Sequence, residues 1–253
     1  MPLPPLQDKT ILVTRPYGRH NNLCSKITEQ GGKCLHYPVI SIEPPPELDI
    51  EQLLKLREQL HSFTMAIFIS PTAVEQSAIY FPVLPEHFTI VSLGSKTTQA
   101  LLARSIPVDI EAPEHNSESL LKTNNFQMPN IDGQRILIFR GTGGRALLGD
   151  TLARRGAQVR YVETYQRQLP PHPPLDEQQV AGLDAITISS NESLDNLVTL
   201  MEDPTPLIDI PLLVPSDRAV TLARQHGFRI IVRSENATDE AFLEALHKYF
   251  STT

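Results

Sequence analysis

The chain has 253 residues, of which 40% are hydrophobic, and its formal net charge is −7. This length allows one large or two modest domains with real cores, and the acidic balance argues against a nucleic-acid partner, which needs a basic face. No apolar run is long enough to span a membrane, and the first ten residues lack the basic-then-apolar order of a signal peptide. We therefore expect a cytoplasmic globular protein with neither a nucleic acid nor a membrane as partner.

Several common site motifs are absent from the sequence. Cys24 and Cys34 are too few for a disulfide framework, and we predict that they are plain core thiols. The eight histidines are scattered without metal-ligand spacing, which argues against a metal site. The sequence contains neither the G-x-S-x-G elbow of many hydrolases nor the phosphate loop of nucleotide triphosphatases.

The first elements form a β-α-β pattern. The apolar residues 10–14 predict a strand that ends at Arg15-Pro16, and residues 22–30 predict a helix that stops at Gly31-Gly32. Residues 33–37 predict a second strand, which must run parallel to the first. A proline-rich stretch at 44–46 then predicts an extended connector before a helix that opens at Leu48-Asp49.

Three further strands follow, at residues 66–70, at residues 90–92 and around Val108. Each strand precedes a polar helix start: Pro71-Thr72, Gly94-Ser95 and Asn116-Ser117. Residues 134–167 then repeat the opening pattern, with a strand at 136–139, a glycine-rich turn, a helix stopped by Gly156, and a strand at 159–162. Aligned without gaps, residues 11–44 match residues 136–169 at six positions: Ile11/Ile136, Leu12/Leu137, Arg15/Arg140, Gly18/Gly143, Leu23/Leu148 and Gly31/Gly156.

The remainder repeats the second pattern. A proline-rich connector at 170–174 precedes a helix opening at Leu175-Asp176, strands at 185–189, at 212–214 and around Ile230, and a last helix after Asn236. Two strands and then three strands therefore occur twice. We predict an α/β protein of two flavodoxin-like domains, each a five-stranded parallel sheet flanked by helices, joined by two extended connectors. Periodicity leaves open which pair of strands joins which triplet.

Small, hydroxylated and cationic residues follow the strands of both predicted sheets, where open α/β sheets bind ligands. With helix N-terminal N–H groups, they predict a site for a ligand with several negative charges, in a cleft lined by both domains. The candidate binding residues are Arg15, Ser70, Thr72, Ser95, Lys96, Ser117, Arg140, Gly141, Gly143, Gly144, Ser189, Ser190, Asn191, Ser216, Arg218 and Thr238.

These residues also allow other interpretations. Gly141-x-Gly143-x-x-Ala146 fits a dinucleotide fingerprint, with Glu163 placed to hold a ribose, which would indicate a nicotinamide-dependent reductase; a tight turn without ligand is the simpler alternative. The serines and threonines fit plain N-caps, and Arg15 and Arg140 fit either ligand contacts or an interdomain salt bridge. Twin α/β domains also serve as two-lobed binding modules.

Tyr165 is predicted to lie on the second connector, near the mouth of the site, with Glu163 and Arg167 on either side. An exposed hinge tyrosine that packs on its neighbour is the alternative. No spacing within the sequence distinguishes the two interpretations.

An ordered set of motifs resembles the uroporphyrinogen-III synthase family: VTRP at 13–16, FISPTAV at 68–74, Gly94-Ser95, SESLL at 117–121, the block at 136–167 and ATDEAFLEAL at 237–246. The likeness covers almost the whole chain. It implies that residues 1–38 join residues 170–253 in one domain and that residues 39–169 form the other. Pro71 and Pro215 depart from the family pattern, because small polar or glycine residues there would offer another N–H group.

The resemblance also implies the activity. Hydroxymethylbilane, a linear tetrapyrrole with eight carboxylates, would lose water and close through a spiro intermediate to uroporphyrinogen III with ring D inverted. It implies a lyase that needs no cofactor or metal, with Tyr165 assisting the departure of water. We expect a monomer, because linkers rather than a large shared core join the predicted domains.

Overall fold

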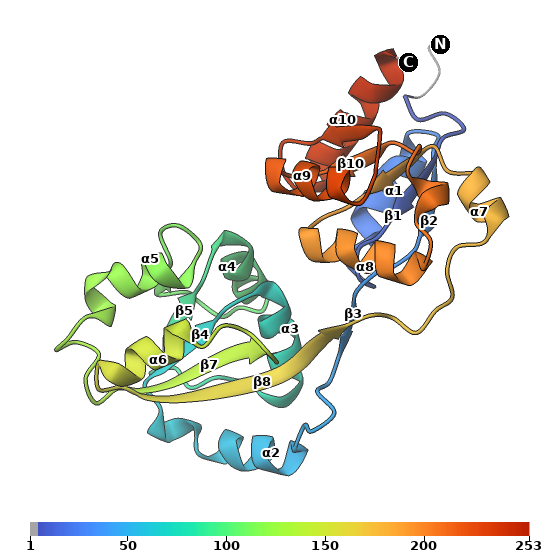
Figure 1. The fold of residues 1–253 in the computed structure, drawn as a ribbon. Coiled ribbons are helices and arrows are strands. Elements are labelled where there is room, and N and C mark those ends of the chain that lie inside the picture. Colours follow the sequence, from blue (N-terminus) through green and yellow to red (C-terminus); the bar gives the residue numbers. More distant parts are fainter. Residues whose placement is uncertain (1–4, 253) are drawn as a thin grey trace. The chain divides into compact units, whose positions relative to one another are not determined.

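The computed structural model describes residues 5–252. The chain forms two compact units, a terminal unit of residues 1–42 with 168–253 and a central unit of residues 43–167 (Figure 1). The chain therefore passes between the units twice. The family resemblance implied crossings at 38/39 and 169/170, and the two units here divide at 42/43 and 167/168.

The terminal unit contains a five-stranded parallel sheet in the order β11-β10-β9-β1-β2. β1 pairs with β9, Ile11 opposite Ala185, so the first two strands join the last three. Its elements are β1 (Thr10–Val13), α1 (Asn21–Glu29), β2 (Lys33–His36), α7 (Glu177–Ala181), β9 (Ala185–Thr187), α8 (Asn191–Met201), η3 (Thr205–Leu207), β10 (Leu212–Val214), α9 (Asp217–Gln225), β11 (Ile231–Arg233) and α10 (Asp239–Thr252).

The central unit contains a six-stranded sheet in the order β3-β8-β7-β4-β5-β6, in which β4 to β8 are parallel. Its elements are α2 (Ile50–Glu58), η1 (Leu60–Ser62), β4 (Met65–Phe68), α3 (Pro71–Tyr80), β5 (Thr89–Ser92), α4 (Ser95–Leu102), β6 (Ile110–Glu111), α5 (Ser117–Lys122), η2 (Asn124–Phe126), β7 (Arg135–Gly141), α6 (Leu147–Arg154) and β8 (Gln158–Gln168), with β3 (Ser41–Glu43) at its edge. Both sheets share one spatial order of five strands: β2-β1-β9-β10-β11 in the terminal unit corresponds to β8-β7-β4-β5-β6 in the central unit. This confirms the flavodoxin-like prediction. β3 is an additional strand that the sequence did not predict.

Helices cover both faces of the terminal sheet because its strands are apolar on both sides. Leu12 packs with α7, α8 and α9, whereas Ile11 and Val13 pack with α1 and α10. In the central unit, α5 and α6 cover one face, and Phe68 and Phe139 stack on the other at 4.6 Å between ring centroids. Burial on both faces explains why these strands read as continuous apolar runs.

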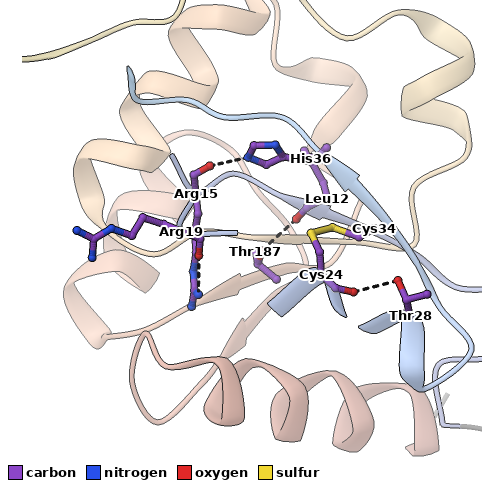
Figure 2. Close-up of a disulfide and its surroundings, with 8 residues drawn as sticks. All are labelled: Leu12, Arg15, Arg19, Cys24, Thr28, Cys34, His36 and Thr187. Carbon is purple, nitrogen blue, oxygen red and sulfur yellow. Dashed lines mark hydrogen bonds between the residues drawn. A yellow bond between two sulfur atoms is a disulfide. The ribbon is translucent and has the colours of Figure 1, made fainter. Parts of the chain in front are cut away.

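The prediction for the cysteines is wrong. Figure 2 shows Cys24 of α1 joined to Cys34 of β2 in a disulfide, with 5.3 Å between their Cα atoms. The helix packs directly against the strand that follows it, which brings two residues ten positions apart within disulfide range. Sequence spacing alone did not reveal this contact.

The structure also corrects the position of Tyr165. Strand β8 extends from Gln158 to Gln168, six residues beyond the predicted end, so Tyr165 lies in the sheet rather than on a connector. A register shift between Arg140 and Gly141 sets Gly141 opposite Tyr165. The tyrosine is 4% exposed, which also excludes the exposed hinge residue considered above.

Candidate active site

The carboxyl edge of the central sheet gathers the loops that follow β4, β5, β6 and β7, together with Tyr165 in β8. Ser70 is the N-cap of α3, Ser95 and Lys96 begin α4, and Ser117 begins α5 after the cap residue Asn116. The glycine loop, residues 141–146, connects β7 to α6. The predicted residues of this half therefore do lie along one edge, as parallel topology requires.

Tyr165 is held at three points. Its hydroxyl lies 3.0 Å from Ser70 Oγ, and its carbonyl accepts a 2.8 Å hydrogen bond from the N–H of Thr142. Its ring packs on Gly141, where a Cβ would lie 2.7 Å from the ring carbons. Gly141 is therefore required by the tyrosine itself, which favours a packing role for this glycine over a nucleotide contact.

Ser70 connects the tyrosine to a helix terminus. Its Oγ accepts a 3.0 Å hydrogen bond from the N–H of Ala73 in the first turn of α3. Pro71 occupies the first helical position, where the lack of an N–H costs no intrahelical bond. The phenol hydroxyl thus lies beside the positive end of a ten-residue helix, with one hydroxyl between them.

Arg140 is buried at 5% exposure and turns back into its own loop. Its Nε donates to the carbonyl of Gly141 at 3.1 Å and its NH1 group to the carbonyl of Arg145 at 3.3 Å. Nε also lies 3.3 Å from a carboxylate oxygen of Glu163, and the guanidinium stacks over Tyr161 at 4.7 Å. A Cβ at Gly144 would clash with this guanidinium. The interdomain salt bridge considered for Arg140 is not what the structure shows, because its partner Glu163 belongs to the same unit.

The carboxyl edge of the terminal sheet carries the second half of the predicted set. Ser190, Ser216 and Thr238 are the N-caps of α8, α9 and α10, each accepting from the N–H three residues later. Asn191 and the exposed Arg218 lie in the first turns of α8 and α9, and Ser189 precedes the first of these caps. The N-cap interpretation of these serines is correct, and it leaves the N–H groups of the first turns without intrahelical partners.

Arg15 at this edge also turns inward. Its NH1 group pairs with Asp239 in the first turn of α10, and its NH2 group donates to the carbonyl of Ala237 at 2.9 Å. The guanidinium lies 5.6 Å from the ring centroid of Phe242. Sequence reasoning missed Asp239 as the partner, although it follows the predicted helix cap at Thr238 directly.

A surface pocket of the central unit lies elsewhere. It is lined by Arg57, Glu58, Leu60, His61 and the residues 82–85. These residues precede β4 and β5, so the pocket belongs to the amino edge of the sheet and not to the edge that carries Tyr165. Within residues 5–252 no group of three or more metal-ligating side chains gathers, and no helix is long and apolar enough to cross a membrane.

The fold and its loops define a class: two-domain α/β proteins with twin flavodoxin-like sheets, one of them assembled from both ends of the chain. The family model described as "Uroporphyrinogen-III synthase HemD" matches residues 21–244. The uroporphyrinogen-III synthase of Escherichia coli K12 is 34% identical over 250 residues, covering 94% of this chain and 99% of the relative. That of Synechococcus elongatus is 30% identical over 207 residues, covering 78% and 76%.

Solved structures agree with this fold. A mutant uroporphyrinogen III synthase of Thermus thermophilus matches with a TM-score of 0.58 at 17% identity, over 95% of this chain and 99% of that one. The Helicobacter pylori enzyme matches with a TM-score of 0.57 at 15% identity, over 97% and 100%. The chain belongs to the uroporphyrinogen-III synthase family, a family of lyases that cyclise hydroxymethylbilane in haem biosynthesis. The family named from the sequence motifs is thereby confirmed.

Proposed function

We propose that this chain converts hydroxymethylbilane to uroporphyrinogen III, with loss of water, a spiro intermediate and inversion of ring D, and that it needs no cofactor. Family membership supports the overall reaction. The observation that carries the residue assignment is the fixed position of the Tyr165 hydroxyl, 3.0 Å from the cap serine of α3. We also propose that the enzyme acts as a cytoplasmic monomer, and light scattering of the purified protein tests its oligomeric state.

Tyr165 assists the departure of the substrate hydroxyl as water. A phenol is protonated at neutral pH and can donate its hydrogen to the leaving oxygen. Charge that develops on the phenol oxygen is then stabilised by the hydroxyl of Ser70, which itself accepts the N–H of Ala73 at the positive end of α3. Ser70 therefore acts through Tyr165 as a positioning residue, in addition to its capping role.

The substrate carboxylates are bound by helix starts at the carboxyl edge of each sheet. First-turn N–H groups of α4, α8, α9 and α10 suit anions, and α3 offers one fewer because Pro71 has none. Lys96 and Arg218 are exposed in first turns, where a cation opposes the helix dipole, and an anionic ligand would relieve that repulsion. The candidate ligands are those of the sequence analysis, with Arg15 and Arg140 acting by holding their loops.

Ring inversion is decided by positioning. The family resemblance implies that free hydroxymethylbilane cyclises without inversion. The enzyme must therefore hold the two ends of the linear tetrapyrrole so that the ring closes with ring D inverted. Effective concentrations of well-oriented groups reach about 10⁵ M or more, which is sufficient to redirect a spontaneous reaction. The rigid Tyr165–Gly141 contact and the first-turn N–H groups supply fixed reference points for that orientation.

The test supplies freshly made hydroxymethylbilane and separates the type I and type III products. Wild-type protein is expected to yield type III, and exclusive type I product would refute the activity. Tyr165→Phe is expected to lower kcat by about 10²-fold, at the lower end for a general acid because the hydroxyl also leaves spontaneously. Full activity of this variant, with an unchanged circular dichroism spectrum, would remove Tyr165 from the mechanism. A nicotinamide-nucleotide titration that shows no binding would dismiss the reductase alternative.

A further inference from the structure

Three aromatic rings gather at the carboxyl edge of the terminal sheet, outside the residues assigned above. They are Tyr17 in the loop after β1, His20 just before α1, and His36, the last residue of β2. The two imidazoles stack with 3.4 Å between centroids and an interplanar angle of 10°. Tyr17 stands edge-on to both, at 6.1 Å from His20 and 5.0 Å from His36. We call these residues the Tyr17 cluster.

Tyr17 has no evident role in the fold. Its side chain is 75% exposed, the second-highest value among the exposed large hydrophobic residues described, and the described residues give its hydroxyl no hydrogen bond. The two imidazoles nevertheless hold its ring at the edge where open α/β sheets bind ligands. A rigid, exposed aromatic ring offers a large contact area at little entropic cost to an aromatic ligand.

The hydrogen bonds of the two imidazoles show which ring nitrogens are already paired. His36 Nε2 lies 2.8 Å from the carbonyl of Arg15, which only accepts, so this nitrogen carries a hydrogen (Figure 2). His20 Nδ1 is buried and has no partner among the described residues. The Nε2–H tautomer of neutral His20 would present a hydrogen-bond donor to a ligand at this edge.

The cluster itself carries little fixed charge. Desolvation, and then the nearby His20 and His172, lower the pKa of His36, opposed by the bond to the Arg15 carbonyl. Arg15 is balanced by Asp239, and Arg19 is exposed in the same loop. A bound carboxylate would favour the charged form of the His36 imidazole, because an opposite charge stabilises it.

We propose that Tyr17 and His20 bind one carboxylate-bearing pyrrole ring of the tetrapyrrole, Tyr17 against the ring and His20 Nε2–H on the carboxylate, with His36 as the positioning residue. This inference rests on the proposed function and adds a substrate contact to it. Since the contact precedes the chemical step, its loss raises KM more than it lowers kcat. Binding also raises the pKa of His36, because the carboxylate favours the imidazolium.

Two measurements test the proposal. In steady-state kinetics, Tyr17→Ala and His20→Ala are each expected to raise KM for hydroxymethylbilane by about 10-fold, the value of one contact of about 1.4 kcal/mol, with kcat changed less than twofold. Tyr17→Phe keeps the ring and is expected to retain the wild-type KM. A partly exposed tyrosine of the central unit, Tyr80, provides a matched control as Tyr80→Ala. Unchanged KM in both alanine variants overturns the proposal.

The second measurement is independent of turnover. Imidazole signals of ring-labelled protein are titrated by NMR from pH 5 to 8, with and without a monopyrrole that carries an acetate and a propionate, and are assigned with His20→Gln and His36→Gln. The ligand is expected to raise the pKa of His36 in wild-type protein and not in Tyr17→Ala. An unchanged titration at saturating monopyrrole overturns the proposal. Failure of wild-type protein to make type III product refutes the proposed function instead, whatever the NMR result.

Discussion

The two copies of the β-α-β unit show how one backbone supports two kinds of edge. Gly18 and Gly143 occupy matching positions and have φ values of +78° and +77°, and Gly31 and Gly156, which stop the first helices, have +83° and +89°. The left-handed backbone explains why glycine recurs at these positions. Matching arginines, Arg15 and Arg140, both bind carboxylates of their own unit.

The edges differ in what the loops hold. In the central unit the loop encloses its arginine and locks Tyr165, and little of either side chain is exposed. In the terminal unit the equivalent loop presents Tyr17 to solvent, and His36 stands where the other copy has Tyr161. The difference teaches that the same backbone can either bury the side chains of its loop or expose them, and the following substitutions test what each arrangement contributes.

The largest effect is expected from the buried arginine. Arg140→Met should cost about 3 kcal/mol of the free energy of unfolding, because it leaves Glu163 unpaired and two loop carbonyls without donors. Glu163 is partly exposed, which keeps the value at the lower end. Arg15→Met should cost less, about 2 kcal/mol, since Asp239 also accepts from Asn22. Urea unfolding measures both, and an equal or greater cost for Arg15→Met would contradict the contrast.

Gly141→Ala comes next and acts mainly on turnover. The added Cβ would lie 2.7 Å from the Tyr165 ring, so the ring must move off Ser70, and kcat should fall by about 10²-fold, as for loss of the phenol itself. The terminal unit has Pro16 at the equivalent position, because no tyrosine packs there. Gly182→Ala is the control for adding a Cβ, since this glycine has a φ of −87° and its Cβ would make only ordinary contacts. A normal kcat in Gly141→Ala would show that Tyr165 needs no such clamp.

The sequence predicted those features of the two edges that depend on residues close together in the chain. The strands, the glycine stops and the serine caps depend on residues within a few positions, and they were found. β3 and the Ser70–Tyr165 contact depend on segments far apart in the chain, 95 residues in the second case, and no local pattern signals them.

The arrangement of the candidate binding residues was predicted only in part. Strand order placed the candidate residues correctly along two edges, because parallel topology determines where the loops go. Whether an arginine reaches outward or inward depends on partners such as Asp239, which lies 224 residues from Arg15. The disulfide was missed for a similar reason, since only packing of α1 on β2 reveals it.

The shared backbone of the two loops predicts equal costs at the matching glycines. Gly18→Ala and Gly143→Ala should each lower the free energy of unfolding by about 1 kcal/mol, because both residues have positive φ and a Cβ would meet nothing within 4 Å. Gly182→Ala is the control, since its φ is −87° and its surroundings allow ordinary contact. A cost at one loop only would show that the two backbones are not equivalent in solution.

The cap serines separate stability from turnover. Ser70→Ala and Ser190→Ala should each cost about 1 kcal/mol, because each side chain accepts an N–H of its helix. Only Ser70 touches Tyr165, so only Ser70→Ala should also lower kcat, by about 5- to 10-fold for one lost hydrogen bond. Ser70→Thr keeps the hydroxyl and should restore both. Equal kcat values for the two alanine variants would remove Ser70 from catalysis.

The smallest effect concerns pH and distinguishes His36 from its counterpart Tyr161. Desolvation lowers the pKa of His36 below 6.5, so the unfolded state binds this proton more readily. Its contribution to stability is therefore constant above about pH 6.5 and falls as the pH drops from there toward the folded pKa. His36 is only partly buried, so we expect its contribution to the free energy of unfolding to change by less than about 1 kcal/mol between pH 7.5 and 5.5.

His36→Gln should lose that dependence relative to wild type, measured as the difference in urea midpoint at the two pH values. Tyr161→Phe, which leaves the imidazole of His36 in place, should keep the wild-type difference. If wild type and His36→Gln lose stability equally on acidification, the imidazole of His36 is not the source of the pH dependence.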